Sequence, residues 1–375
     1  MKNSFELMKE RNKKKVMHYI YNYGPISRVE ISEKIGLAPA TVSNIVKKLL
    51  KSNLVKESKR APSSGGRKPV LLEINDSGVF FIGLKWGINS INAVLLNLNA
   101  DIIASKTINN NNYNLDNFLH ITKKLIKDME DKSGNKNKIF GLGLGIHGPV
   151  NPQSGISLYA PHFKWENINI QEKLDSLVDY PVFIDNDVRM MALGEKWGGV
   201  GEKAENFIYV NLDYGIGSGI VIKNELYYGN DWTAGEFGHM TVVDNGPLCS
   251  CGKRGCLEAV ASIERLTERY FNNNENLTVE EKWEKFNLDL SKGKEKAVEI
   301  INEVANHLGT GLANLINLFN PQFVILGGEM MKTSDFIYPI IKKKVKEDSL
   351  NIASKGNVIK KSSFGKYAGA RGAGA

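Results

Sequence analysis

All three cysteines of the chain lie in one short stretch that could bind a metal ion. Cys249, Cys251 and Cys256 follow His239 at spacings of 10, 2 and 5 residues. Thiolates and a neutral imidazole at such spacings suit a closed tetrahedral zinc site, in which four protein ligands leave no open position for catalysis. The alternative is three reduced, buried thiols beside a core histidine. We favour a structural zinc, because isolated core cysteines have no reason to cluster.

Two carboxylates flank these four residues. Glu236 precedes His239 by three residues, and Glu258 follows Cys256 by two. A metal that fixes both ends of the loop also fixes the two carboxylates relative to each other. Because carboxylates accept hydrogen bonds from vicinal hydroxyls, this loop is typical of a rigid frame for a polyol.

The composition is that of a globular protein with room for two or three domains, since 42% of the 375 residues are hydrophobic and 24% are charged. No apolar run reaches the roughly 18 residues that a membrane span needs. The polar, basic start of the chain lacks the apolar segment of a signal peptide. Three cysteines cannot form a disulfide framework, so a reducing cytoplasm is the expected location.

The net charge of +8 is concentrated near the N-terminus. Residues 1–75 contain 16 Lys and Arg against 6 Asp and Glu, a net charge of +10, whereas the rest of the chain has a net charge of −2. A basic head on a nearly neutral body favours a nucleic-acid-binding module joined to something else.

A helix-turn-helix is predicted within this head. After a helical face over 15–23, Ser27 and Glu30 have the spacing of a capping box, and Gly36 follows the helix that they begin. Pro39 then starts a second helix with one apolar face. Two short helices around a Gly-containing turn are typical of this motif. The side chains expected to contact DNA, the first three at base edges and the lysines at phosphates, are Thr41, Ser43, Asn44, Lys47 and Lys48.

A wing is predicted after the second helix, with Val55–Glu57 pairing with Val70–Ile74. Between these strands, Arg67 follows two glycines and could enter a narrow minor groove. A flexible basic linker is an equal alternative for Arg67. We expect residues 1–75 to form a winged helix-turn-helix DNA-binding domain and residues 76–375 to form a second domain.

Strands and helices alternate in two cycles along the second domain, which predicts a bilobed α/β body with a cleft near 185–190 and 235–258. Asp185-Asn186-Asp187 ends one predicted strand, where α/β sheets commonly place ligand-binding groups. The predicted strands cover 79–84, 91–98, a stretch near Ile102, 139–145, 181–184, 207–212 and 323–326. The predicted helices cover 115–129, 188–197, 262–272 and 297–319, and the small, Gly-rich residues 368–375 are expected to lie inside or just before a further helix.

These motifs together resemble the ROK family of repressors, open reading frames and sugar kinases, over residues 79–375. The predicted helix-turn-helix extends the resemblance to the repressor branch and to nearly the whole chain. The resemblance implies two actin/hexokinase-like lobes with a sugar bound between them and zinc in the cysteine loop. The stretches that carry it are Gly141–Val150, Asp185–Asp187 with Ala192–Glu195, Gly235–Met240 and Cys249–Glu258.

The resemblance also implies the sugar-binding residues, of which His239 would bind zinc as well. In the kinases of the family, the residue at Asp187 is the base that removes a proton from the attacking hydroxyl. A carboxylate at that place can equally bind a hydroxyl without catalysis. Arg189 is interpreted either as a brace for Asp187 or as a surface residue. The residues implied to bind sugar are Asn186, Asp187, Glu236, His239 and Glu258.

Two stretches depart from the kinase pattern. The family's first phosphate motif is Asp-x-Gly-Gly-Thr, whereas this chain has Lys85-Trp86-Gly87-Ile88-Asn89, so a cation replaces the acid. The second motif, Gly-Thr-Gly, reads Asp213-Tyr214-Gly215, which places an acid where phosphate would bind. Because phosphoryl transfer depends on these groups, we expect no ATP use and no enzymatic activity.

Three functions are compatible with these observations. We favour a sugar-responsive repressor of sugar-utilisation genes, in which a homodimer binds a pseudo-palindromic operator and a sugar releases it. The resemblance is to the xylose-responsive repressors of Gram-positive bacteria, which makes xylose the expected inducer. The alternatives are a sugar kinase with a DNA-binding head, and a DNA-binding protein whose body only mediates dimerisation.

Overall fold

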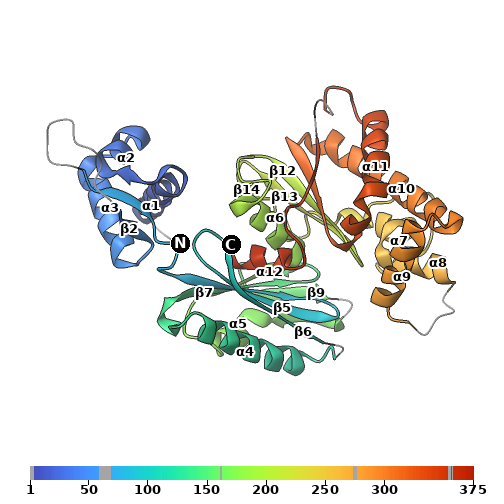
Figure 1. Cartoon of the computed structure of the whole chain (residues 1–375), viewed down its shortest axis with the longest axis horizontal. Helices are drawn as coiled ribbons and strands as arrows, with labels where there is room; N and C mark the ends of the chain where they lie inside the picture. The colour runs from blue at the N-terminus through green and yellow to red at the C-terminus, as the bar shows by residue number, and fades with distance from the viewer. Residues whose placement is uncertain are drawn as a thin grey trace.

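The computed structural model describes residues 4–58, 69–110, 112–160, 163–272, 277–353, 356 and 358–375. Figure 1 shows a small N-terminal unit, coloured blue, beside a larger body built around two sheets. Arg67, which we expected to enter a minor groove, lies outside the described residues. Within the described part of the chain, no helix combines the length and the apolar character needed to cross a lipid bilayer.

The N-terminal unit is a winged helix-turn-helix, as predicted. Ser27 and Glu30 form the reciprocal hydrogen bonds of a capping box at the start of the second helix. Gly36 ends that helix with a φ of 68°, a left-handed conformation that glycine adopts without strain. Val55 pairs with Ile74 in the wing. The elements are α1 (Ser4–Tyr23), β1 (Ile26–Ser27), α2 (Arg28–Ile35), α3 (Pro39–Lys51), β2 (Val55–Glu57) and β3 (Leu71–Ile74).

Helix α1 is longer than the sequence pattern predicts, because it begins at Ser4 and not near Lys15. The residues before Lys15 are mostly polar residues of good helix propensity, so they extend the helix without forming an apolar face. A prediction based on apolar periodicity therefore recognises only the part of α1 that packs on the rest of the head.

The body contains two five-stranded sheets with the same topology, which confirms the prediction of two cycles. Their strand orders are β6-β5-β4-β7-β11 and β14-β13-β12-β15-β16. In each sheet the first three strands are antiparallel and the last two join in parallel. The first sheet contains β4 (Phe80–Trp86), β5 (Ser90–Leu96), β6 (Ile102–Asn109), β7 (Ile139–Ile146) and β11 (Val182–Asn186). The second contains β12 (Phe207–Leu212), β13 (Ile216–Ile222), β14 (Glu225–Leu226), β15 (Phe323–Gly327) and β16 (Ile359–Lys361).

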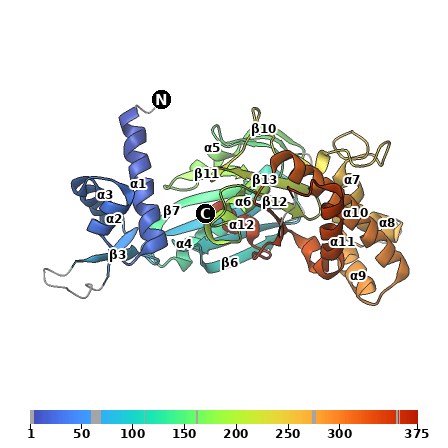
Figure 2. The ribbon, with the colours of Figure 1, turned by 90° about the horizontal axis from the view of Figure 1, so that it is seen from above.

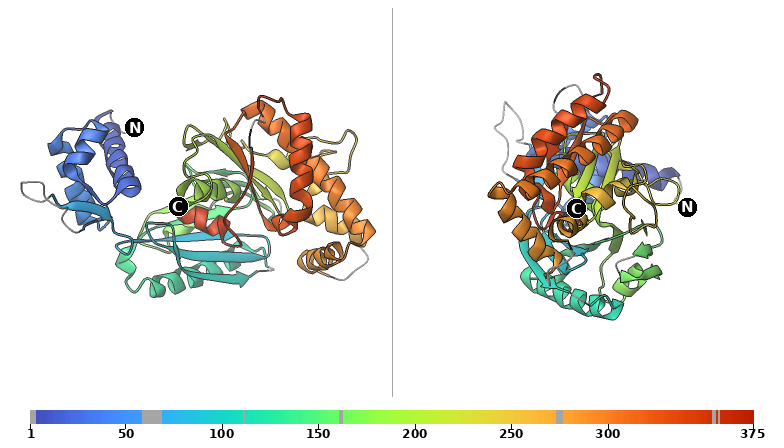
Figure 3. Two further views of the ribbon diagram at one scale, coloured as in Figure 1. Left: turned by 45° about the horizontal axis from the view of Figure 1, so that its top comes forward. Right: turned by 90° about the vertical axis from the view of Figure 1, so that its right-hand side faces the viewer.

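Helices cover the outer faces of both sheets. Figure 3 shows α4 on the outside of the first sheet and α10 and α11 on the far side of the second. The covering helices are α4 (Leu115–Lys132), α5 (Ile170–Asp175), α10 (Glu295–Phe319) and α11 (Ser334–Asp348). Three further helices pack on α10 and on one another: α7 (Leu257–Ala261), α8 (Ile263–Phe271) and α9 (Val279–Ser291). Short elements complete the body: η1 (Lys136–Lys138), β8 (Val150–Asn151), β9 (Ile156–Ala160), β10 (Trp165–Asn169), η3 (Phe237–His239) and η4 (Glu329–Thr333).

Two helices, α6 (Asp187–Gly198) and α12 (Ala368–Gly374), lie between the sheets (Figure 1). Helix α12 packs on β4, β5 and β7, whereas α6 packs mainly on β12 and β13 and less extensively on β7 and β11. The two helices also pack on each other. A Cβ atom on Gly83 or Gly143 would lie within 2 Å of a carbonyl oxygen of α12. The small residues of the last segment therefore allow a helix to pass very close to the first sheet.

Candidate functional site

The four predicted metal ligands converge in the structure. The Nδ1 atom of His239 lies 3.6 Å from Sγ of Cys249, and Sγ of Cys251 lies 3.7 Å from Sγ of Cys256. One ligand atom from each of the four residues falls within 4.8 Å of the other three. The loop also brings its ends together, since Thr241 bridges Cys256 and Leu248 bridges Arg254. This arrangement is compatible with a closed metal site.

The two ring nitrogens of His239 face different groups. Nδ1 points toward the thiols, whereas Nε2 lies 3.8 Å from an Oε atom of Glu236. A metal bound through Nδ1 would leave Nε2 as a hydrogen-bond donor, oriented toward the carboxylate. The structure therefore places His239 where it can bind a metal through one ring nitrogen and a polar ligand through the other.

Glu258 joins the cysteine loop to the second sheet. One of its carboxylate oxygens accepts a hydrogen bond from the backbone nitrogen of Ile216 at 3.0 Å, and the other lies 3.4 Å from the hydroxyl of Ser250. A Cβ atom on Gly215 would approach the same carboxylate to 3.0 Å. Glu258 is therefore held in place by the start of β13 and by the loop itself, a role that its position in the sequence did not reveal.

Glu236 is the carboxylate that a ligand from solvent can reach most directly, because 45% of its side chain is exposed. Desolvation by the surrounding protein raises the pKa of Glu236. The nearby His239 and Arg189 lower this pKa, whereas the carboxylates of Glu258 and Asp187 raise it. These opposing effects show that the carboxylates predicted to bind sugar lie close enough to influence one another. A neutral polyol, which donates several hydroxyl hydrogens to carboxylate acceptors, suits such a cluster.

Asp187 forms a buried ion pair that the sequence did not predict. Its Oδ2 atom lies 3.4 Å from Nζ of Lys85, and the two side chains are only 7% and 16% exposed. Among the described residues, its Oδ1 atom is buried without a hydrogen-bond partner. A buried oxygen without a hydrogen-bond donor costs free energy, so Oδ1 is well suited to accept a hydrogen bond from a hydroxyl of a bound ligand.

Asn186 serves as the N-cap of α6. Its Oδ1 atom accepts hydrogen bonds from the backbone nitrogens of Val188 and Arg189, each at 3.0 Å. Its Nδ2 atom donates to the carbonyl of Gly148 at 3.1 Å. The amide therefore orients the start of α6, and one N–H of the side chain is left to contact a ligand.

Neither interpretation of Arg189 was correct, because this residue is 2% exposed and binds Asp185, not Asp187. Its Nε atom donates to Asp185 at 2.7 Å, and its terminal nitrogens donate to the carbonyls of Trp232 and Val150, each at 2.8 Å. The i, i+4 spacing places Arg189 beside Asp185, while Asp187 turns toward Lys85. A spacing of four residues from Asp185 was the signal that could have identified this pair.

Acidic side chains of the second lobe act on the charge of Lys85 together with Asp187. Burial disfavours its charge, but Asp187 and Asp213 outweigh that effect and raise the pKa of Lys85. Burial raises the pKa of Asp213 to about 6, and Lys85 opposes this increase. Glu329 adds to the negative field at both residues. Asn89 ends the stretch that begins at Lys85 and differs from the kinase phosphate motif. Its Nδ2 atom donates a hydrogen bond to Glu280 at the start of α9.

Replacing Lys85 with methionine should destabilise the fold by about 3 kcal/mol, because it leaves the buried carboxylates of Asp187 and Asp213 without their cation. Urea unfolding followed by circular dichroism measures this change. The matched control is Lys106→Met, which removes an ion pair between a strand lysine and Asp128 that is 42% and 33% exposed. That control should change the stability by no more than about 1 kcal/mol, and equal effects of the two substitutions would contradict the buried pairing.

The predicted DNA-contacting side chains lie on one face of the head. Val42, Val46 and Leu49 of α3 are buried in the core of the head. Ser43, Asn44, Lys47 and Lys48 are exposed, and Thr41 is partly buried. A helix that buries one side and presents hydroxyl, amide and ammonium groups on the other has the character of a recognition helix.

Replacing Asn44 with alanine should weaken binding to a specific operator by about tenfold while changing non-specific binding little, because an amide reads base edges. Fluorescence anisotropy with an operator fragment and a scrambled duplex at one salt concentration measures both. Lys47→Ala is the comparison, since loss of a phosphate contact should weaken binding to both duplexes equally. An equal loss on both duplexes for Asn44→Ala would make Asn44 a backbone contact.

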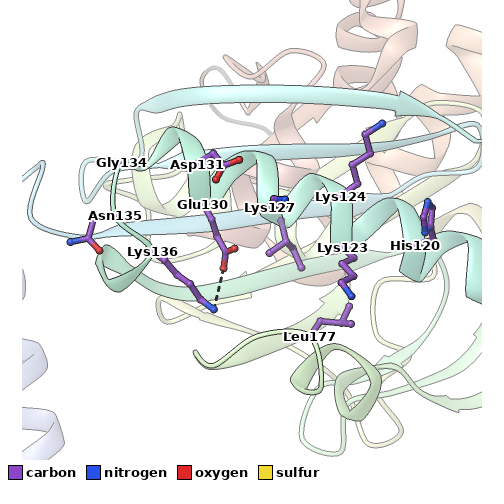
Figure 4. A pocket seen from close by; sticks show the side chains of 11 residues that line it. His120, Lys123, Lys124, Lys127, Glu130, Asp131, Gly134, Asn135, Lys136 and Leu177 are labelled. Atoms are coloured by element: carbon purple, nitrogen blue, oxygen red, sulfur yellow. Dashed lines mark ion pairs between the residues drawn. The ribbon is translucent and has the colours of Figure 1, made fainter.

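A shallow hollow beside α4 contains none of the predicted site residues. Figure 4 shows the side chains of Lys123, Lys124 and Lys127 rising from α4, with Glu130 and Asp131 among them. Glu130 lies 3.9 Å from Lys136, which further balances the charge. Mixed charges on an exposed helix face are typical of a solvated surface, so we assign no function to this hollow.

Comparison with known proteins identifies the chain. Residues 81–375 match the model of the ROK family, and residues 9–56 match a model described as winged helix-turn-helix DNA-binding. The chain belongs to the ROK family. The motifs that suggested this family from the sequence, including the cysteine loop and Asp185–Asp187, fall within the matched region.

Relatives with both domains and relatives with the body alone are known. The chain is 37% identical over 341 residues to a putative xylose repressor from Caldicellulosiruptor sp. (strain Rt8B.4), covering 86% of this chain and 84% of that protein. A crystal structure of a ROK family transcriptional regulator, a homolog of E. coli MLC protein, superimposes with a TM-score of 0.85 at 27% identity, covering 98% and 95% of the two chains. A ROK family glucokinase from Streptomyces griseus, in complex with glucose and AMPPNP, has a TM-score of 0.68 at 25% identity, covering 79% of this chain and 98% of that one.

Proposed function

We propose that this ROK protein is a transcriptional repressor whose affinity for operator DNA falls when a sugar binds near Asp187. The relatives that share both domains support a repressor, since they are named as repressors or transcriptional regulators. The observation that carries the proposal is the ion pair between Lys85 and Asp187. The carboxylate that would serve a kinase as a base is here held by a lysine, while its second oxygen is left for a hydroxyl.

The surroundings of Lys85 argue against nucleotide binding. A polyphosphate that approached Lys85 would also meet Asp213, Glu329 and Glu280, the last of which already binds Asn89. Several carboxylates repel phosphate unless metal ions intervene, and the acid that would position such an ion is replaced by Lys85. We therefore propose that protein groups from the second lobe fill the place of the phosphates, and that the protein is no enzyme.

We propose that the metal in the cysteine loop is zinc and that its role is structural. A tetrahedral zinc with Zn–S bonds of about 2.3 Å and a Zn–N bond of about 2.05 Å has S···S edges of about 3.8 Å and S···N edges of about 3.6 Å. The corresponding distances here are 3.7 Å and 3.6 Å. Four protein ligands complete the coordination, so the metal would hold Glu236, His239 and Glu258 in place without taking part in chemistry.

We propose xylose as the sugar, because a relative that is 37% identical over 86% of the chain is named a putative xylose repressor. A pentose offers vicinal hydroxyls to carboxylate and amide acceptors, which the site supplies in number. Xylose and glucose differ by one hydroxymethyl group, so a direct comparison of the two sugars tests this assignment. The residues proposed to bind the sugar are Asn186, Asp187, Glu236, His239 and Glu258.

We propose that residues 1–75 bind DNA and residues 76–375 bind sugar, and that two copies of the chain form a homodimer. A dimer presents two α3 helices to the half-sites of a pseudo-palindromic operator. The residues proposed to contact DNA are Thr41, Ser43, Asn44, Lys47, Lys48 and Arg67. Sugar binding lowers operator affinity only to the extent that the sugar prefers the form of the dimer that does not match the half-sites.

The experiment that tests this proposal is operator binding by fluorescence anisotropy, titrated with xylose, with glucose and without sugar, at one salt concentration. We expect xylose alone to raise the dissociation constant for operator by about 5- to 150-fold. No response to either sugar would contradict the proposal.

The alternative function is a sugar kinase with a DNA-binding head, which the similarity to a ROK family glucokinase and the presence of Asp187 favour. Following Mg-ATP consumption in the same samples separates the two. Turnover of ATP in the presence of either sugar, without an effect on operator binding, would favour the kinase.

A further inference from the structure

Helix α6 connects the proposed sugar site to the DNA-binding head. It begins at Asp187, directly after its N-cap Asn186, and ends at Gly198. One residue before this end, the ring of Trp197 lies 5.5 Å from the ring of Tyr21 in α1. A helix of 12 residues is about 18 Å long, so a single rigid element spans from the carboxylate to the head. Figure 2 shows α1 on the side of the head that faces the body.

Helix α6 packs mainly on the second lobe, although it also contacts β7 and β11 of the first sheet. A Cβ atom on Gly217 or Gly219 of β13 would meet Val188 and Ala192 of α6 at about 3 Å, so the helix lies very close to this strand. At the other end, Nζ of Lys196 donates to the carbonyl of Ala204 at 2.8 Å and to Asn224 at 2.7 Å. The end of α6 that carries Trp197 is therefore fastened to the second lobe.

The head, in contrast, is attached to the first lobe. Val79 and Leu98, which flank β4 and β5, belong to the same buried cluster as Val46 and Leu49 of α3. Leu72 of the wing joins this cluster as well. A movement of the second lobe relative to the first would therefore also be a movement of Trp197 relative to the head.

The interface between the lobes allows such a movement. Helix α12 packs on the first sheet and α6 mainly on the second. These helices meet at Gly194 and Gly372, where a Cβ atom on Gly194 would lie 3.0 Å from the backbone of Gly372. Packed helices with few protruding side chains can slide over each other, as in shear motions of other proteins. The sliding surface lies along α6, beside the start of the helix where the sugar is proposed to bind.

Tyr21 lies in a defined seat on the body. Burial raises the pKa of Tyr21, so part of its ring is removed from water. Besides the ring of Trp197, three charged residues of the body lie close enough to affect the pKa of Tyr21. Glu202 after α6 and Asp101 in the turn after β5 raise it, and Arg371 of α12 lowers it. Trp197 itself is 40% exposed, so its ring covers Tyr21 without belonging to the core of either lobe.

We propose that α6 couples the Asp187 site to the head through the contact between Trp197 and Tyr21, a proposal that rests on the function proposed above. Sugar binding at the start of α6 shifts the second lobe along α12, and Trp197 carries this shift to α1. The two forms of the protein then differ in where Tyr21 packs on the body, and this packing sets the orientation of α3 relative to the body. Trp197 and Tyr21 are positioning residues for the response and contact neither sugar nor DNA.

The test is Trp197→Ala, assayed for sugar affinity by calorimetry and for operator affinity by anisotropy with and without xylose. We expect the affinity for xylose to stay within about twofold of the wild type, while the ratio of the two operator dissociation constants falls by about three- to tenfold. Trp197→Phe keeps an aromatic ring and should retain most of the response. Phe183→Ala removes a ring that is 64% exposed on β11 of the first lobe and should leave the response unchanged.

Two outcomes separate this proposal from the proposed function. If wild-type protein shows no response to either sugar, the proposed function fails. If the wild type responds and folded Trp197→Ala responds to the same extent, the coupling through α6 is wrong. Tyr21→Ala removes the other ring of the contact and should reduce the response equally, so it tests the same contact should Trp197→Ala fail to fold. A full response in Tyr21→Ala would likewise overturn the proposal.

Discussion

Cys251→Ala protein should contain less than about one tenth of an equivalent of zinc per chain and should unfold at a temperature lower by about 5 °C or more. Cys251 is the exposed member of the cluster, whereas Cys249 and Cys256 are 4% and 0% exposed. Its replacement therefore removes a metal ligand with little loss of packing. Elemental analysis of purified protein gives the metal content, and differential scanning calorimetry gives the unfolding temperature.

The loss of the metal should affect the sugar response before it affects the fold. The loop holds His239 and Glu258, and Glu258 accepts a hydrogen bond from the backbone nitrogen of Ile216 at the start of β13. We therefore expect Cys251→Ala protein to bind operator at 20 °C but to lose its response to xylose. Lys253→Ala, an exposed substitution in the same loop, is the control and should retain zinc and response. Unchanged zinc content in Cys251→Ala would refute the proposed ligand set.

Asp187→Ala should abolish the sugar response while leaving operator binding unchanged. The substitution removes the carboxylate whose Oδ1 atom is buried without a partner in the described structure, so a ligand hydroxyl loses a charged acceptor. We expect the affinity for xylose to fall by at least about a hundredfold. Lys85 keeps Asp213 as a counter-ion, so the fold should persist. Calorimetric titration with xylose and anisotropy with operator measure the two affinities.

The control for this substitution is Asp175→Ala, which removes an exposed carboxylate at the end of α5. It should change neither affinity, although it alters the net charge by the same amount. A response to xylose that survives in Asp187→Ala protein would place the sugar elsewhere, and a loss of operator binding would show that the substitution damages the fold.

The architecture was predictable where a local signal coincided with a buried element. The capping box at Ser27 and the glycine at Gly36 identified the start and end of α2, and the apolar runs at 139–145 and 207–212 identified central strands. Helices α9 and α11 were not predicted, because their apolar residues are sparse among many charged ones. Pro339 within α11 further obscured that helix, since proline is unfavourable in a helix interior.

The metal ligands were predictable because cysteine is rare in this chain and its spacing is informative. The ion pair between Lys85 and Asp187 was not predictable from spacing, since the residues lie on different elements and meet only when β4 and α6 pack near each other. The sequence indicated that Lys85 was incompatible with phosphate binding, but only the fold reveals which carboxylates it binds. The contact between Tyr21 and Trp197 likewise depends on how the head docks on the body.

The most direct test of the central claim is the affinity for xylose of free protein and of protein saturated with operator DNA, both measured by calorimetry. Linkage requires that the sugar and the DNA weaken each other's binding by the same factor. We predict that the operator complex binds xylose more weakly, by about 5- to 150-fold, and that this factor equals the rise in the operator dissociation constant caused by xylose. Equal xylose affinities in the two states would contradict the claim that one chain couples sugar binding to DNA release.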